Sequence, residues 1–260
     1  MKLIKIFLPW MNVQVQAFIY LPETPRLDLF AIFTHGYTSD KSSVMPWAYK
    51  LMEINIASIC FDLPGHYNGS FNEVDRFEDF KLKAHELFRT AEKVLMETLK
   101  ATFGKEIDFN RARLILGGHS LGALLALKAL SNRSDFHPYQ VVYALGVGLG
   151  LAPKQVVHIF DTPLFKATMI YRAQLVSKAL HPDLVFPWIK EEKLHLNFQD
   201  QVVHLICGED DVVVGTNGAH ELKAMLESCR NTVTLDSPRN LPHHKPEEAA
   251  VFIKKWIQSI

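Results

Sequence analysis

The chain has 260 residues, of which 48% are hydrophobic and 22% charged, and this composition excludes an intrinsically disordered protein. Lys plus Arg and Asp plus Glu each number 28, so the formal net charge is +0 and no overall field attracts nucleic acid or an anionic membrane. These values favour a protein that acts on a small molecule and has no nucleic-acid partner.

The cysteines and the apolar runs bear on the compartment. Cys60, Cys207 and Cys229 are odd in number and have no CxxC spacing, so neither a disulfide framework nor a zinc site is indicated. A reducing, cytoplasmic location is therefore expected. No apolar run approaches the roughly 20 residues of a membrane span, so stable membrane insertion is not expected.

The first predicted element is a β-hairpin. The apolar run of residues 1–8 stops at Pro9, and residues 12–16 (NVQVQ) then alternate like a strand. A signal peptide is the alternative interpretation of this lysine-containing start.

Two buried parallel strands are predicted at 29–34 (LFAIFT) and 56–61 (IASICF). Apolar residues at helical spacing over 44–53 supply the crossover between them. A longer helix is predicted over 77–102, followed by a strand at 114–116. This alternation predicts an α/β fold with a mostly parallel central sheet flanked by helices, in one domain spanning 1–260.

The run GHSLG at 118–122 joins the strand at 114–116 to an apolar helix at 121–130. Glycines on both sides of Ser120 permit a sharp turn that exposes the hydroxyl, so Ser120 is the predicted nucleophile. An oxyanion hole needs two N–H donors. The sequence predicts them at Leu121, which follows the nucleophile, and at Tyr37, where Gly36 lets the backbone approach closely.

The next two strands are predicted at 141–145 and 202–207. About 55 residues lie between them, which is far longer than a usual connection. The content of this insertion predicts a small helical cap or lid over approximately 150–198, with a surface decoration as the alternative. Its apolar side chains either contact an apolar acyl or alcohol group or form the core of the cap itself; they are Phe160, Leu164, Phe165, Phe186 and Trp188.

A catalytic acid is expected at the end of a strand after the serine, and the run CGEDDVVV at 207–214 fits this position. Asp211 is the predicted acid, because Val212 and Val213 can anchor the loop in the core. Asp210 remains the alternative.

The final elements are predicted as a helix at 220–229, a strand at 232–235 and a helix at 246–257. The loop before this last helix contains His243 and His244, one of which is the predicted base. His243 is preferred because His244 lies closer to the rigid first turn of the helix, and the other histidine is expected to face solvent or cap the helix. Single histidines elsewhere, such as His35, His66 and His119, are expected to be structural.

With HG, DLPGH, GHSLG, GEDD and HHKPEE in this order, the chain resembles the α/β-hydrolase superfamily over nearly its whole length. It is most similar to the esterase, lysophospholipase and serine-aminopeptidase-like members. The resemblance implies a triad of Ser120, Asp211 and His243 or His244, with no cofactor and no metal.

The function implied is that of a serine hydrolase that cleaves a carboxylic ester or related acyl bond of a small-molecule substrate through an acyl-enzyme. Thioesterase and acyltransferase activities use the same triad and stay open. Many members have Gly-His soon after the last strand, where this chain has Arg239-Asn240. That departure motivates another alternative, an inactive binding protein with the same fold. The sequence does not specify an oligomeric state.

Overall fold

A computed structural model describes residues 1–152, 159–215 and 217–260. Its centre is an eight-stranded sheet in the order β1-β2-β4-β3-β5-β6-β7-β8. The strands from β4 to β8 pair in parallel, as the sequence predicted, and this confirms the α/β fold class.

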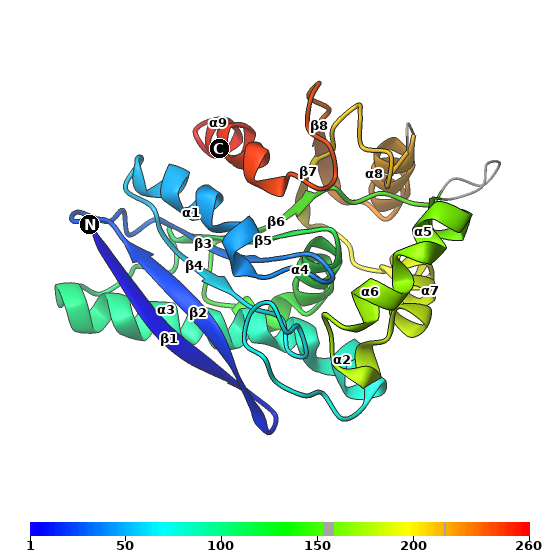
Figure 1. The fold of residues 1–260 in the computed structure, drawn as a ribbon. Helices are drawn as coiled ribbons and strands as arrows, with labels where there is room; N and C mark the ends of the chain where they lie inside the picture. The colour runs from blue at the N-terminus through cyan, green and yellow to red at the C-terminus, as the bar shows by residue number, and fades with distance from the viewer. Residues whose placement is uncertain (153–158, 216) are drawn as a thin grey trace.

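The predicted hairpin is present as β1 (Lys2–Trp10) and β2 (Val13–Leu21), which pair antiparallel. β2 continues the sheet by pairing antiparallel with β4. The apolar run near the start of the chain therefore belongs to β1, an edge strand of the sheet (Figure 1).

The six parallel strands are β3 (Leu29–Thr34), β4 (Ala57–Phe61), β5 (Arg113–His119), β6 (Val141–Val147), β7 (Val202–Ile206) and β8 (Thr232–Asp236). Every residue of β3 and β4 is buried. Helices cover both faces of the sheet, which explains why the central strands are apolar runs rather than alternating ones.

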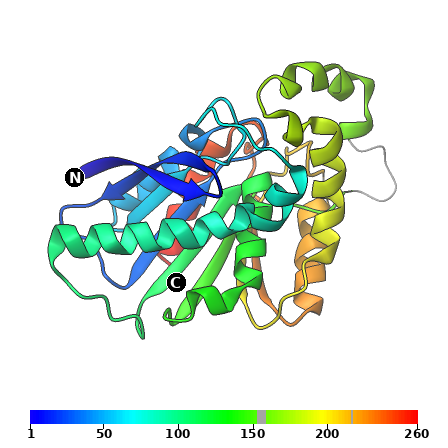
Figure 2. The ribbon, with the colours of Figure 1, turned by 90° about the horizontal axis from the view of Figure 1, so that it is seen from below.

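Two layers of helices sandwich the sheet. Helices α1 (Met45–Met52) and α9 (Ala250–Ile257) lie together on one face (Figure 1). The other face is covered by α3 (Leu87–Phe103), α4 (Leu121–Ser131) and α8 (Gly218–Ser228) (Figure 2). Almost all of α4 is buried, since it packs between the sheet and its neighbouring helices.

The prediction of a single helix over 77–102 was wrong. The structure has α2 (Phe77–Lys83), the 3-10 turn η2 (Ala84–Glu86) and then α3. The indole of Trp10 donates to the carbonyl of Lys83 at 3.0 Å, and Lys128 Nζ donates to the carbonyl of Lys81 at 3.1 Å. These distant side chains bind carbonyls at the end of α2, where the helix breaks.

The last helix also begins differently from the prediction. Residues Pro246–Ala249 form the 3-10 turn η7, and α9 follows. The indole of Trp47 donates to the Pro246 carbonyl at 2.7 Å, which holds this turn against α1.

The segment between β6 and β7 is helical, as predicted. It contains η4 (Ile159–Asp161), α5 (Pro163–Ala167), α6 (Met169–Ala173), η5 (Lys178–Leu180), α7 (Pro182–Glu192) and η6 (Lys193–His195). Positions 153–158 of the predicted cap lie outside the described residues. Within the described ranges, no helix combines the length and the hydrophobicity that crossing a bilayer requires.

Candidate active site

Ser120 lies at the sharp turn between β5 and α4. Its backbone has φ 51° and ψ −109°, in the left-handed region that costs a non-glycine residue about 1–3 kcal/mol. Its N–H donates to the carbonyl of Val147 on the neighbouring strand at 2.9 Å. The surrounding structure therefore holds Ser120 in a conformation that an isolated turn would avoid.

The two glycines of the GHSLG run are required by close approach. A Cβ on Gly118 would lie 2.3 Å from the carbonyl carbon of Gly122. A Cβ on Gly122 would lie 2.5 Å from the His35 carbonyl oxygen and 2.7 Å from that of Thr34. The first turn of α4 thus packs directly on the turn that follows β3.

That turn holds the predicted second oxyanion donor, Tyr37. A Cβ on Gly36 would lie 2.7 Å from Nδ1 of His119, so the turn touches the residue next to the nucleophile. Within the described ranges, the N–H groups of Tyr37 and Leu121 donate to no protein acceptor. The Tyr37 hydroxyl donates to the Leu180 carbonyl at 2.5 Å, which ties the turn to the segment between β6 and β7.

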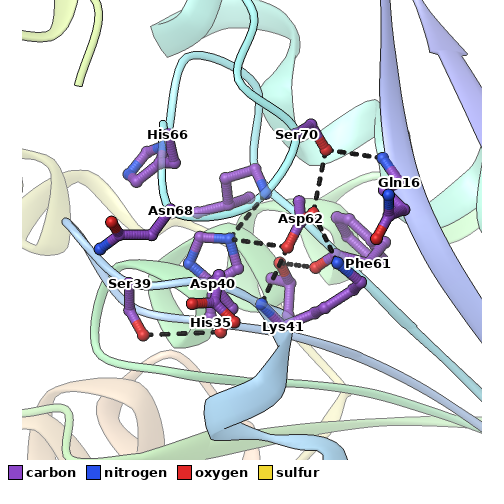
Figure 3. A network of polar contacts seen from close by, with 12 residues as sticks. Gln16, His35, Ser39, Asp40, Lys41, Phe61, Asp62, His66, Asn68 and Ser70 are labelled. Carbon is purple, nitrogen blue, oxygen red and sulfur yellow. Dashed lines mark hydrogen bonds and ion pairs between the residues drawn. The ribbon is translucent and has the colours of Figure 1, made fainter. Parts of the chain in front are cut away.

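A buried ion pair anchors the far end of the same turn (Figure 3). Lys41 Nζ lies 2.9 Å from Asp62 Oδ2, and the Lys41 N–H donates to Asp62 Oδ1 at 2.9 Å. Ser70 Oγ also donates to this carboxylate at 2.9 Å and accepts the Gln16 N–H at 2.7 Å. Asp62 is fully buried, so three donors, one of them the Lys41 ammonium group, offset the cost of removing its charge from water.

His35 joins the turn to the loop after β4. Its Nε2 accepts the N–H of Leu63 at 2.8 Å, which assigns the proton to Nδ1, the atom that donates to the Gly36 carbonyl at 2.8 Å. Burial lowers the pKa of His35 to about 4, so the ring is neutral near pH 7. The structural role predicted for His35 agrees with these contacts.

Asp211 follows β7 and is 2% exposed. Its Oδ1 accepts the N–H groups of Val213 and Val214, each at 2.9 Å. The prediction that Val212 anchors this loop in the core was wrong, because Val212 is 71% exposed. The carboxylate itself anchors the loop, through hydrogen bonds to the backbone.

The neighbouring acid has a different set of contacts. Asp210 is exposed, and its Oδ1 accepts the N–H of Leu241 at 2.9 Å. Leu241 lies just before the two candidate histidines. Asp210 therefore fixes the path of the loop that follows β8.

The two histidines of this loop occupy different surroundings. His243 Nδ1 lies 2.8 Å from Asp211 Oδ2, and its side chain is 17% exposed. Because an ionised carboxylate only accepts hydrogen bonds, Nδ1 carries the proton and Nε2 has a free lone pair. His244 is exposed and forms no hydrogen bond with Asp211, although both histidines line the same pocket as Ser120.

His119 is a site residue that sequence reasoning assigned only a structural role. It also lines the pocket, and its ring centroid lies 4.7 Å from that of His243. Burial is the main cause that lowers its pKa well below the usual value, so the ring is an uncharged neighbour of His243. Its position next to Ser120 in the GHSLG run was the available signal.

The pocket that contains Ser120 and His243 has a volume of about 240 Å³. Phe160, Phe165 and Phe186 line one side, with ring centroids 4.4–5.1 Å apart. The other two apolar residues singled out in the sequence lie elsewhere. Leu164 is 81% exposed, and Trp188 packs on α2.

The part of the chain that the structure describes contains no group of three or more His, Cys, Asp or Glu side chains that could hold a metal ion.

The chain matches a family model and several solved structures. The model of the Alpha/beta hydrolase family matches residues 31–251. An alpha-beta serine hydrolase homologue from Coxiella burnetii is 14% identical with a TM-score of 0.56, over 97% of this chain and 96% of that one. An esterase from Pyrococcus furiosus is 18% identical with a TM-score of 0.61, over 99% and 92%.

A thioesterase domain from the curacin biosynthetic pathway is 13% identical with a TM-score of 0.62, over 99% of each chain. At these identities the structural likeness shows the fold alone. No curated protein sequence matches the chain.

Proposed function

The chain belongs to the alpha/beta hydrolase family, and we propose that it is a serine hydrolase that cleaves a carboxylic ester, or a related acyl bond, of a small or moderately apolar molecule. The observation that carries this proposal is the 2.8 Å hydrogen bond between Asp211 and His243 beside a pocket that also contains Ser120. A buried acid, an oriented imidazole and a serine that lines the pocket are the three groups that acyl transfer by a serine requires.

In the proposed mechanism, Ser120 Oγ attacks the carbonyl carbon while His243 Nε2 takes its proton. The N–H groups of Tyr37 and Leu121 stabilise the oxyanion that forms. When this tetrahedral intermediate collapses, the bond to the leaving alcohol breaks and the alcohol takes the proton from His243. The acyl group stays on Ser120. Water then attacks with the same proton transfers, releasing the carboxylic acid and restoring Ser120.

Asp211 would keep the proton of His243 on Nδ1 and stabilise the imidazolium that forms during each attack. The described residues contain no hydrogen bond from Ser120 Oγ to His243. Such bonds often tighten only when substrate is bound, so their absence does not argue against the role.

The departure at Arg239-Asn240 leaves His243, the proposed base, within hydrogen-bonding distance of Asp211. Asp210 holds Leu241 by its N–H, and two residues later His243 contacts Asp211. These contacts favour an active enzyme over an inactive binding protein with the same fold.

We further propose that the helices between β6 and β7 act as a cap on a single domain, over approximately 150–198, and shape the substrate site. Phe160, Phe165 and Phe186 support this role by lining the pocket. The three cysteines have free thiols, and this supports a cytoplasmic enzyme that acts on a small molecule.

The test is hydrolysis of p-nitrophenyl acetate, butyrate, octanoate and palmitate by wild type, Ser120→Ala, His243→Ala and His244→Ala. Circular dichroism confirms that each variant is folded. We expect Ser120→Ala and His243→Ala to be inactive and His244→Ala to retain most activity. An inactive His244→Ala beside an active His243→Ala would overturn the assignment of the base, and a parallel thioester assay separates esterase from thioesterase.

A further inference from the structure

An arginine from the helical segment lines the same pocket as Ser120. Arg172 belongs to α6 and is partly buried. Its Nη1 donates to Thr38 Oγ1 at 3.0 Å and its Nε donates to Thr168 Oγ1 at 3.1 Å. The guanidinium also lies 5.0 Å from the ring centroid of Phe165.

Among the residues that the structure describes, no acid balances the charge of Arg172. Within the described ranges no carboxylate oxygen lies within 4.0 Å of its guanidinium, and both of its side-chain acceptors are neutral hydroxyls. Burial lowers the pKa of Arg172, and the smaller opposing effect comes from the Tyr37 phenol rather than from a carboxylate. Among the described residues that line this pocket, Glu247 has a carboxylate, but it is exposed and makes no ion pair with Arg172.

The hydrogen-bonding capacity of Arg172 is only partly used. A guanidinium has five N–H donors, and the two printed bonds use one on Nε and one on Nη1. The remaining donors, two of them on Nη2, have no acceptor among the described residues. A partly buried arginine with free donors in a pocket is the arrangement that binds a carboxylate with two parallel hydrogen bonds.

We infer that Arg172 binds a carboxylate on the substrate, so that the pocket selects acyl esters with one negative charge next to an apolar portion. This inference rests on the proposed hydrolase function. A single guanidinium matches the charge of a carboxylate, whereas a phosphate dianion would leave one charge unbalanced. Phe160, Phe165 and Phe186 contact the apolar portion.

The test compares two acyl esters of equal chain length, p-nitrophenyl hexanoate and mono-p-nitrophenyl adipate, which differ by one terminal carboxylate. The same comparison on the alcohol side uses phenyl hexanoate and 4-carboxyphenyl hexanoate. Each is measured with wild type, Arg172→Met, Arg172→Lys and Lys166→Met. Lys166 is an exposed cation of the same segment, so Lys166→Met is a control for loss of charge alone.

We expect Arg172→Met to lower kcat/KM for one of the two carboxylate esters by about tenfold to a hundredfold, as loss of a charge-assisted pair predicts. The matching neutral ester should change by less than about threefold. Arg172→Lys should recover part of the loss, and Lys166→Met should resemble wild type.

Equal losses on charged and neutral esters would assign Arg172 to holding the Thr38 turn and overturn the inference, while the hydrolase proposal would stand. Calorimetric binding of both carboxylate esters to Ser120→Ala, with and without Arg172→Met, gives a readout that needs no turnover. Unchanged affinity for both would also overturn the inference. A third outcome is that wild type hydrolyses none of the esters, although the carboxylate esters bind in a way that depends on Arg172. This outcome would overturn the hydrolase proposal and leave the inference on Arg172 standing.

Discussion

Replacing Lys41 with methionine removes the cation that faces Asp62 while keeping the length of the side chain. Asp62 is 0% exposed, and the Lys41 side chain is 8% exposed, so water cannot replace the lost partner without opening the fold. Breaking a buried pair in this way typically costs about 3–5 kcal/mol. The Lys41 N–H and Ser70 hydroxyl remain bound to the carboxylate, which favours the lower end, about 3 kcal/mol.

This cost can be converted into a change in melting temperature. An unfolding entropy of about 2.1 cal/mol/K per residue over 260 residues gives roughly 0.55 kcal/mol/K. A loss of about 3 kcal/mol therefore lowers Tm by roughly 5–6 °C. Because Lys41 anchors the turn that contains Tyr37, kcat for ester hydrolysis should also fall, by about tenfold, if that turn supplies an oxyanion donor.

The assay is differential scanning calorimetry, with Lys50→Met as the matched control. Lys50 forms an exposed pair with Glu53 at 2.6 Å, and exposed pairs contribute about 0–1 kcal/mol. We expect the control to melt within about 2 °C of wild type. A Tm for Lys41→Met equal to that of Lys50→Met would refute the reasoning that the buried pair stabilises the turn.

Three other predictions concern His66, Asp211 and Gly122. Burial lowers the pKa of His66 from 6.5 to about 3, so between these values the unfolded chain binds a proton that the folded chain does not. Stability should therefore fall as pH drops below about 6.5, by about 1.4 kcal/mol per pH unit for this group, and urea unfolding of His66→Phe should show a shallower pH dependence than wild type; an identical slope would contradict this. Asp211→Asn should lower kcat by on the order of 10³–10⁴-fold with an unchanged circular dichroism spectrum, while Asp210→Asn should cost far less, and equal losses would argue against Asp211 as the acid. Gly122→Ala should be destabilised by more than about 2 kcal/mol in chemical denaturation, because its Cβ would lie 2.5 Å from a carbonyl oxygen, and wild-type stability would refute that contact.

Much of the sheet could be predicted because its buried strands are continuous apolar runs. The run at 29–34 coincides with β3, and the run at 56–61 differs from β4 by one residue. The break between α2 and α3 could not be predicted in the same way. It coincides with a hydrogen bond from Trp10, a residue 73 positions away in the sequence.

In the candidate site, too, the sequence predicts local features but not the contacts between distant segments. The order of Ser120, Asp211 and His243 along the chain could be read from motifs, whereas the distance between Asp211 and His243 depends on how two loops meet. The loop anchor assigned to Val212 was wrong because hydrophobicity alone does not reveal the hydrogen bonds that Asp211 makes to the backbone. No sequence motif indicates Arg172 as a binding residue. Its place in the pocket depends on tertiary contacts with Thr38 and Phe165.

Covalent labelling of the full chain with a fluorophosphonate, followed by peptide mass spectrometry, tests whether Ser120 is the nucleophile and His243 is the base. We expect one adduct on Ser120 in wild type, none in Ser120→Ala, and strongly slowed labelling in His243→Ala with near-normal labelling in His244→Ala. A folded wild-type protein that stays unlabelled, or that is labelled equally fast without His243, would contradict the proposed nucleophile and base.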